Sequence, residues 1–245
     1  MKAIRSRQNS NEKQADSFAS LPFLKGEKAM KYRCAIFDMD GTTLYTLQDR
    51  SDGVNFSLRK NGLPERQIAE IRRFVGNGIH REIEQAVPEG SSEAVIQKVF
   101  DDFNGWYAKH CYDHTKPYDG ILLLLSHLRS AGMKTAIVSN KGDYAVQILD
   151  EKYFSGLIDA GVGEKQGIAR KPAPDTVNAV LDSLQIDRNE AVYIGDSEVD
   201  LETAANAGMD CIIVTWGYRD EDFLRSRGAE LLVHTPEELE KVLLD

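Results

Sequence analysis

The chain has 245 residues, of which 42% are hydrophobic and 28% are charged, so it can bury a large core in one large domain or two smaller ones. The formal net charge of −9 argues against broad binding to nucleic acid or to an anionic membrane, although a local site can still hold a small anion. The cysteines at 34, 111 and 211 form no CxxC pair, so we expect neither a disulfide framework nor a zinc cluster.

Residues 1–30 mix charges of both signs with polar side chains and show neither a helical nor a strand period, so we expect a disordered extension there. They contain no apolar stretch of the kind that a secretory signal needs. The longest apolar run, Ile121 to Leu125, is far shorter than the roughly 20 residues of a membrane-spanning helix. We therefore expect a cytoplasmic protein with no membrane partner.

From residue 31 onward, short apolar runs alternate with amphipathic segments. The apolar runs predict strands at 32–37, 135–138, 157–162, 191–194, 211–215 and 231–233. The segments between them predict helices at 122–130, 144–152, 176–184 and 201–207 and a last helix after Thr235, which is followed by Pro236 and Glu238. This alternation predicts an α/β fold with a doubly wound, Rossmann-like parallel sheet.

One region breaks the alternation. Residues 47–116 carry helical periodicity without a convincing buried strand, as in "VNFSLRKNGL" and "AVIQKVFDDFNGWYAKH". We therefore predict an inserted α-helical cap domain at 47–116 and an α/β core domain built from 31–46 and 117–245. Because the insertion follows directly on "FDMDGTTLYT", we expect it to lie over the polar residues of that stretch.

In open parallel sheets, ligands bind beyond the carboxyl ends of the strands. The polar residues that follow the predicted strands or precede the next helix supply carboxylates, a hydroxyl, an amide and an ammonium; they are Asp38, Asp40, Ser139, Asn140, Lys171, Asp196 and Asp200. A bound Mg²⁺ would offset the repulsion among these carboxylates. With the metal in place, one carboxylate could attack phosphorus while a second protonates the leaving oxygen. The set is typical of a site for phosphoryl transfer.

Each motif alone has an ordinary structural interpretation, such as an Asp-rich turn or an acidic helix start. Together and in this order, "DMDGTT", "VSN", "KPAP" and "GDSEVD" resemble the four motifs of the haloacid dehalogenase superfamily of phosphatases. The stretch "RFVGNGIHREIEQA" resembles the cap of its phosphoglycolate phosphatase-like subfamily. The resemblance implies a magnesium-dependent phosphatase that acts on a small phosphorylated metabolite through an aspartyl-phosphate.

The resemblance also implies a role for each motif residue. Asp38 would be the nucleophile and Asp40 the general acid and base, whereas Ser139, Asn140 and Lys171 would bind the phosphate. Mg²⁺ would be bound by the Asp38 side chain, the Asp40 main-chain carbonyl and Asp196, with Asp200 supporting this site from behind. Two residues depart from the family pattern, because Thr43 replaces a usual leucine and Tyr45 a frequent aspartate.

Other interpretations stay open at this point. A sugar phosphomutase or an inorganic pyrophosphatase would carry the same motifs, and a signalling module could accept phosphate on Asp38 and hold it. Tyr45, Asn77 and Gly78 are candidate contacts to the leaving group, although the glycine-rich stretch 76–78 could equally be a plain turn. His110 and His114 could bind a metal if they share a helical face, but a polar surface is the favoured interpretation.

Overall fold

The computed structural model describes residues 30–245, so the predicted extension lies outside the described residues except for Met30. The described chain forms a six-stranded parallel sheet in the order β5-β4-β1-β6-β7-β8. The strands are β1 (Cys34–Phe37), β4 (Lys134–Gly142), β5 (Ala160–Glu164), β6 (Ala191–Gly195), β7 (Asp210–Val214) and β8 (Leu232–Val233). This sheet confirms the predicted doubly wound α/β fold.

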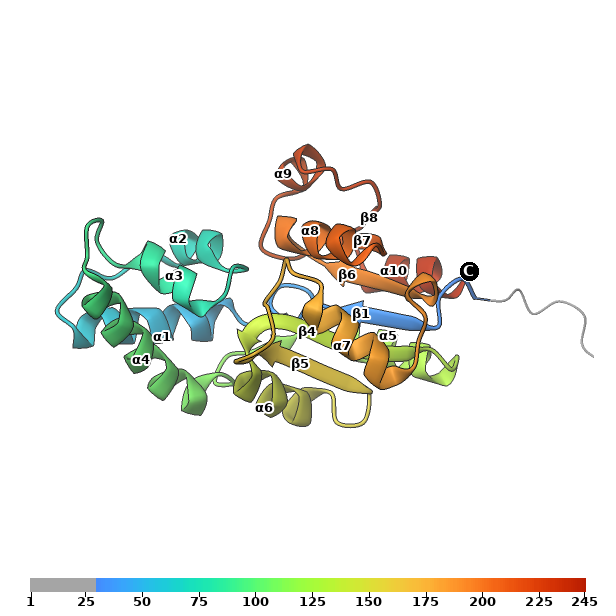
Figure 1. Ribbon diagram of the computed structural model, residues 1–245, viewed down its shortest axis with the longest axis horizontal. Helices are drawn as coiled ribbons and strands as arrows, with labels where there is room; N and C mark the ends of the chain where they lie inside the picture. The colour runs from blue at the N-terminus through green and yellow to red at the C-terminus, as the bar shows by residue number, and fades with distance from the viewer. Residues whose placement is uncertain (1–29) are drawn as a thin grey trace, which may run out of the picture.

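Helices cover both faces of the sheet (Figure 1). The central strand β1 explains why, because all four of its residues are buried and alternate side chains point to opposite faces. Ala35 and Phe37 join the apolar cluster of α5 (Ile121–Ser130), α6 (Asp143–Tyr153) and α10 (Pro236–Leu244). Cys34 and Ile36 join the cluster of α7 (Asp175–Leu184) and α8 (Glu198–Ala207).

A helical insertion, which we define as Leu47–His110, forms a separate lobe beside the sheet (Figure 1). It consists of α1 (Leu47–Lys60), α2 (Ile68–Phe74), α3 (Ile79–Ala86) and α4 (Glu93–His110). Two short strands connect it to the sheet, β2 (Leu44–Tyr45) and β3 (Lys116–Pro117), and they pair antiparallel. The insertion follows closely on the carboxyl end of β1, where open parallel sheets bind ligands.

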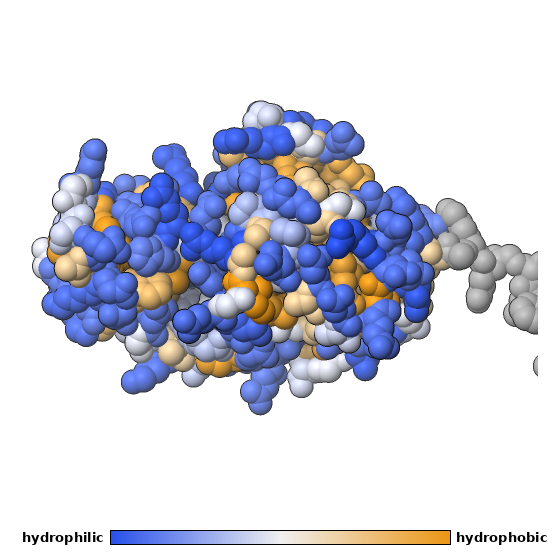
Figure 2. Space-filling model, viewed as in Figure 1, coloured by the Kyte–Doolittle hydropathy of each residue, from blue (hydrophilic) through white to orange (hydrophobic). Residues whose placement is uncertain are grey.

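The apolar side chains of the insertion pack in the same cluster as those of one sheet face. Val54 and Leu58 of α1 and Phe103 and Tyr107 of α4 are buried, because their spacing along each helix places them on one side. The outer surface of both lobes is mostly hydrophilic on the face that Figure 2 shows. Within residues 30–245, no helix is long and apolar enough to cross a membrane.

The structure differs from the predicted elements at several ends. The strand predicted from Leu157 starts at Ala160, and β4 continues past Val138 to Gly142 with an irregular pairing to β5. Helix α8 begins at Glu198 instead of Leu201, because Ser197 and Asp200 form a capping box. The elements β2, β3, α9 (Glu221–Ser226) and the 3-10 turn η1 (Arg188–Glu190) were not predicted, since each is too short to show a period.

Candidate active site

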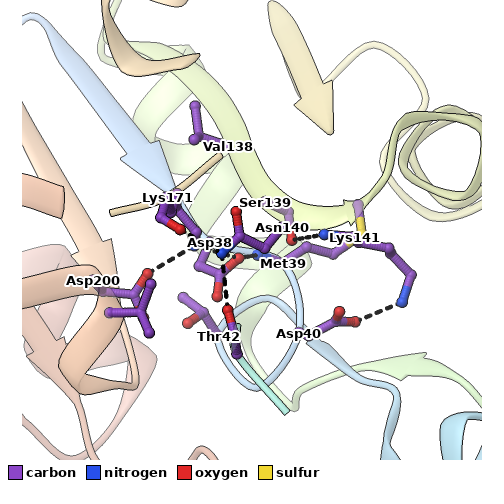
Figure 3. Close-up of polar contacts among 12 residues, drawn as sticks. Asp38, Met39, Asp40, Thr42, Val138, Ser139, Asn140, Lys141, Lys171 and Asp200 are labelled. Atoms are coloured by element: carbon purple, nitrogen blue, oxygen red, sulfur yellow. Dashed lines mark hydrogen bonds and ion pairs between the residues drawn. The ribbon is translucent and has the colours of Figure 1, made fainter. Parts of the chain in front are cut away.

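The predicted motif residues come together at the carboxyl end of the sheet (Figure 3). Asp38 directly follows β1, Asp196 directly follows β6, and Ser139 lies in the extension of β4. These strands are neighbours in the sheet order β4-β1-β6. Because parallel strands end at the same edge, residues far apart in the sequence meet there, and all three side chains are buried.

Lys171 links the carboxylates of Asp38 and Asp200. Its Nζ lies 3.0 Å from Asp38 Oδ1 and 2.8 Å from Asp200 Oδ1. Asp38 Oδ1 also accepts a hydrogen bond from the Met39 N–H at 2.7 Å, whereas Asp38 Oδ2 has no protein partner among the described residues. Burial lowers the pKa of Lys171, but the adjacent Asp200 and Asp38 more than offset this and hold it well above its usual range.

Three carboxylates form a cluster that fits a divalent cation. Asp38, Asp196 and Asp200 each offer an oxygen atom within 4.8 Å of the others. Burial, together with repulsion from Asp200 and Asp38, raises the pKa of Asp196 to about 8. Burial also raises the pKa of Asp38 to about 6, although Lys171 opposes the shift. One lysine therefore does not balance the cluster, and oxygen ligands with excess negative charge are what Mg²⁺ prefers.

Asp200 is the least available member of this cluster. Its Oδ1 accepts from Lys171, and its Oδ2 accepts from the Ser197 N–H at 3.1 Å and the Ser197 hydroxyl at 2.7 Å. Asp196 is fixed by the Thr42 hydroxyl at 3.2 Å and the Tyr218 N–H at 2.7 Å. The roles of Asp196 as a metal ligand and of Asp200 as its support stay predictions.

Glycines let the main chain approach Asp196 closely. Gly41 has a φ of +89°, and a Cβ there would lie 2.4 Å from Asp196 Oδ2. A Cβ on Gly217 would lie 2.3 Å from the same atom. Contacts this short are forbidden, so the loop after β1 and the loop after β7 both need glycine to close around this carboxylate.

The Asp40 side chain points away from Asp38 and toward the helical insertion (Figure 3). Its Oδ1 accepts from the Thr46 hydroxyl at 2.6 Å and from Lys141 Nζ at 2.8 Å, and its Oδ2 accepts from Arg50 Nη1 at 2.9 Å. Burial alone would raise the pKa of Asp40, but Lys141 and Arg50 overcome it and lower the pKa to about 2. In this arrangement Asp40 is an ionised acceptor.

The partners of Asp40 extend into a buried network that the sequence analysis missed. Arg50 also donates to Glu82 of α3, and Lys141 Nζ donates to the hydroxyl of Tyr107 on α4 at 2.7 Å. All four side chains are at most 3% exposed. Arg50 Nε and Glu82 Oε1 are buried without a hydrogen-bond partner among the described residues. The network therefore joins the insertion to the core directly beside the motif residues.

Ser139 and Asn140, the other predicted residues of the core, make different contacts. Ser139 is buried, and its hydroxyl accepts from the Lys141 N–H at 3.3 Å. The Asn140 amide donates to the carbonyls of Lys171 at 2.9 Å and Gly76 at 3.0 Å, so its side chain positions two loops. Its predicted contact to phosphate stays a prediction.

The three candidate contacts to the leaving group also separate. Gly78 lines the cavity at the site. Asn77 is exposed, and Tyr45 packs edge-on against Tyr118 with ring centroids 6.2 Å apart, so neither lines that cavity. As a contact to the leaving group, Gly78 is therefore better placed than Tyr45 or Asn77.

The histidines of the insertion do not share a helical face, because α4 ends at His110. His110 is bonded to Asp113 at 2.7 Å and stacks on Trp106. His114 lies near Asp49, but the Asp49 carboxylate accepts from the main-chain N–H groups of His114 and Thr115. Asp49, Asp52 and His114 also offer ligand atoms within 4.8 Å of one another, so the polar surface stays the favoured prediction without being tested.

The cavity above Asp38 is almost closed. Its volume is about 10 Å³, which is room for about one water molecule. Its lining combines the strand ends with the loop that follows α2, and comprises Asp38, Asp40, Arg50, Val75, Gly76, Gly78, Ser139, Asn140, Lys141, Asp196, Ser197, Tyr218 and Arg219. This space is smaller than a phosphate group.

Comparison with known proteins agrees with the fold and with the family that the motifs indicate. A family model for haloacid dehalogenase-like hydrolases matches residues 35–214. Phosphoglycolate phosphatase of Aquifex aeolicus is 30% identical over 206 residues, which cover 82% of this chain and 95% of that protein. N-acetylmuramic acid 6-phosphate phosphatase of Pseudomonas aeruginosa is 29% identical and covers 88% of this chain and 96% of its own length.

A solved structure is also similar over nearly its full length. The crystal structure of a presumed phosphoglycolate phosphatase from Lactobacillus delbrueckii subsp. bulgaricus has a TM-score of 0.82 and 39% identity, and covers 87% of this chain and 99% of that one. The chain therefore belongs to the haloacid dehalogenase-like hydrolases, which confirms the resemblance that its motifs indicated. Within that family it is a phosphatase, similar to the phosphoglycolate phosphatases.

Proposed function

We propose that this phosphatase hydrolyses the monoester of a small phosphorylated metabolite, such as phosphoglycolate, in a Mg²⁺-dependent reaction through an aspartyl-phosphate on Asp38. The observation that carries the proposal is the buried Asp38 carboxylate, which has one oxygen held by Lys171 and Met39 and the other without a protein partner. A carboxylate positioned in this way is oriented for attack and keeps a free lone pair.

In the first step, Asp38 Oδ2 attacks phosphorus, and the bond between phosphorus and the leaving oxygen breaks. Lys171 and the Ser139 hydroxyl orient the phosphate oxygens and stabilise their negative charge. Mg²⁺ would be held by Asp38, Asp196 and the Asp40 carbonyl, and would supply positive charge to the phosphate when bound. In the second step, a water oxygen attacks phosphorus, and the bond to Asp38 breaks to release inorganic phosphate.

Asp40 would protonate the leaving oxygen in the first step and take a proton from water in the second. In the structure its carboxylate is turned toward Lys141, Arg50 and Thr46. Because these partners keep Asp40 ionised, the side chain must leave them, take up a proton from water or from the phosphate monoester, and rotate toward Asp38 before it can protonate the leaving oxygen. We propose that the helical insertion acts as a cap, and that its closure around a bound substrate accompanies this rotation.

The test is phosphate release from a panel that contains phosphoglycolate, sugar phosphates, nucleotides and pyrophosphate, with Mg²⁺ and with excess chelator. We expect metal-dependent release, with the fastest turnover for a small monoester. Release from pyrophosphate alone would identify a pyrophosphatase instead. No release from any member would contradict the proposal, and a bisphosphate-dependent isomerisation or a stable phosphate on Asp38 would then identify a mutase or a phospho-accepting module.

The substrate class is proposed from the relatives, whose names include phosphoglycolate and a phosphorylated amino sugar. Both are small phosphorylated molecules, which is the partner class that the sequence predicted. The predicted cytoplasmic location stays a prediction.

A further inference from the structure

The loop that follows α2 forms the roof of the cavity over the site. Val75, Gly76 and Gly78 of this loop line the cavity together with Asp38 and Asp196. The loop belongs to the insertion, and the catalytic carboxylates belong to the core. The residues that hold this roof to the core therefore decide whether the site is open or closed.

Arg219 makes the most extensive contact between the core and this roof. It follows β7 and is a core residue that lines the same cavity. Its Nη2 donates to the Val75 carbonyl at 2.8 Å, and its Nη1 donates to the Arg72 carbonyl at 3.2 Å. Both carbonyls are at the C-terminal end of α2, where backbone oxygens lack partners within the helix. A charged donor to such a carbonyl forms a stronger hydrogen bond than a neutral one.

Glu198 fixes the guanidinium from the core side. Its Oε2 accepts from Arg219 Nε at 2.8 Å, and its Oε1 accepts from Nη2 at 3.3 Å. Glu198 is in the first turn of α8, two residues after Asp196. The main chain next to Arg219 is fixed to the loop between β6 and α8, because the Tyr218 N–H donates to Asp196 in that loop. The guanidinium is thus held at a fixed position relative to the proposed metal site.

We propose that Arg219 is a positioning residue that holds the loop Val75–Gly78 closed over Asp38, with Glu198 orienting it. This inference rests on the proposed function. Since the closed cavity admits about one water molecule, the hydrogen bonds from Arg219 to the loop must break for substrate entry and form again before chemistry. Glu198 remains paired with Arg219 when the loop opens, so the guanidinium is ready for the next closure.

Asn140 makes a second and weaker contact to the same loop, through the Gly76 carbonyl at 3.0 Å. The exposed pair of Arg72 and Asp220 lies outside the loop and has a separation of 3.2 Å. Of these contacts, only that of Arg219 combines a full charge, two carbonyls at the end of α2 and a partly buried counter-ion, Glu198. We therefore expect it to contribute most to closure.

The test is the Arg219→Ala variant, assayed with the best substrate of the panel. Loss of two charge-assisted hydrogen bonds shifts the equilibrium toward the open loop. We expect KM and the inhibition constant for inorganic phosphate to rise by roughly 10-fold or more, with kcat changed by less than about 3-fold. Arg219→Lys should restore part of the loss, because a lysine keeps the charge but reaches fewer carbonyls.

Hydrogen exchange gives a readout that needs no activity. In the substrate-free protein, amides of the segment 75–78 should exchange faster in Arg219→Ala than in the wild type, and Glu198→Gln should have a smaller effect in the same direction. The matched control is Arg225→Ala, which removes an exposed arginine of α9 that pairs with Glu221, and it should leave exchange and KM unchanged.

Unchanged KM and unchanged exchange in Arg219→Ala would overturn the proposal. A fall of kcat without faster exchange would also overturn it, because Arg219 would then act on the substrate instead of the loop. If the wild type hydrolyses nothing but Arg219→Ala still exchanges faster at 75–78, the proposed function fails while the positioning role stands.

Discussion

The core side and the insertion side of the site are built in different ways, and we call them the core wall and the insertion wall. The core wall is a cluster of four side chains at the strand ends, namely Asp38, Lys171, Asp196 and Asp200. Asp38 and Asp196 directly follow strands, Asp200 is in the first turn of α8, and Lys171 is in the loop before α7. The insertion wall consists of side chains from three separate helices, namely Arg50, Glu82 and Tyr107, and of the loop after α2. The first is rigid and anchored in the sheet, and the second is attached to the sheet by two short strands.

This difference separates the residues proposed to carry out phosphoryl transfer from those proposed to control the entry of the substrate. Groups that must be held to a fraction of an ångström for phosphoryl transfer are positioned by buried strands. Groups that move aside for each substrate in the proposed function are positioned by hydrogen bonds and ion pairs that can break. Changes to the core wall should therefore abolish turnover, whereas changes to the insertion wall should alter affinity, stability and closure.

The largest expected effect is that of Asp38→Asn in the core wall. The amide keeps the size of the side chain but cannot form the phosphoryl bond, so turnover should fall by roughly 10⁴-fold or more. The measurement is steady-state phosphate release, with thermal unfolding to show that the fold is intact. Asp222→Asn, an exposed residue of α9, is the matched control. Retained hydrolysis would remove Asp38 from the role of nucleophile.

Asp40 touches both walls and should have the next largest effect. Asp40→Asn removes proton transfer, which typically contributes roughly 10² to 10⁴-fold. The loss should be much smaller for p-nitrophenyl phosphate than for an alkyl phosphate, because nitrophenolate leaves without a proton. Equal losses for the two substrates would indicate that Asp40 matters for structure or metal binding and not as an acid.

Glu82→Ala tests the insertion wall through stability. It leaves the buried Arg50 with Asp40 as its remaining carboxylate partner, so unfolding free energy should fall by about 3 kcal/mol. Urea unfolding followed by the fluorescence of Trp106, which is in the insertion, measures this. Glu84→Ala on the same helix removes a more exposed carboxylate and should cost less than about 1 kcal/mol. Equal costs for the two variants would refute the importance of the buried network.

The last prediction concerns how the melting temperature of the metal-free protein depends on pH through the carboxylates of the core wall. The folded-state pKa values of Asp38 and Asp196 are raised to about 6 and about 8. A raised carboxyl pKa gives stability below the unfolded value that is lost as pH rises through the folded value. In chelator, the melting temperature should therefore fall as the pH is raised from 5 to 8.

Mg²⁺ should reverse this fall and stabilise more at pH 8 than at pH 5, because binding then displaces fewer protons. In Asp196→Asn the chelated protein should show a flatter profile and a weaker response to Mg²⁺. A chelated wild type whose melting temperature rises over this range would contradict the raised pKa values.

The same two walls explain what the sequence could predict. Asp38, Asp196 and Ser139 were found because a polar residue directly after an apolar run marks a strand end, and parallel strand ends converge. The approximate positions of the six strands along the chain and the helical character of the insertion followed from sequence pattern, whereas the order of the strands in the sheet was not predicted. Ends such as Leu157 were misplaced because local apolar content does not show where a ladder of hydrogen bonds begins.

The insertion wall could not be predicted in the same way. Arg50 and Glu82 are ordinary charged residues in amphipathic helices, and only the packing of α1 against α3 and the core buries them. Arg219 lies in the loop beyond β7 and not directly after the strand, as Asp38 and Asp196 do, so the strand-end rule does not identify it. Its partners are backbone carbonyls, which leave no trace in side-chain identity.

The pairing of the two short strands β2 and β3 has a consequence for how such a protein can change during evolution. The chain leaves the core through Leu44 and Tyr45 and returns through Pro117 and Lys116, which pair directly with them. The ends of the insertion are therefore adjacent, and a longer, shorter or different lobe can be placed there without shifting the register of the sheet. Evolution, or a protein engineer, can exchange the helical insertion while the strand-end cluster of the core is inherited unaltered.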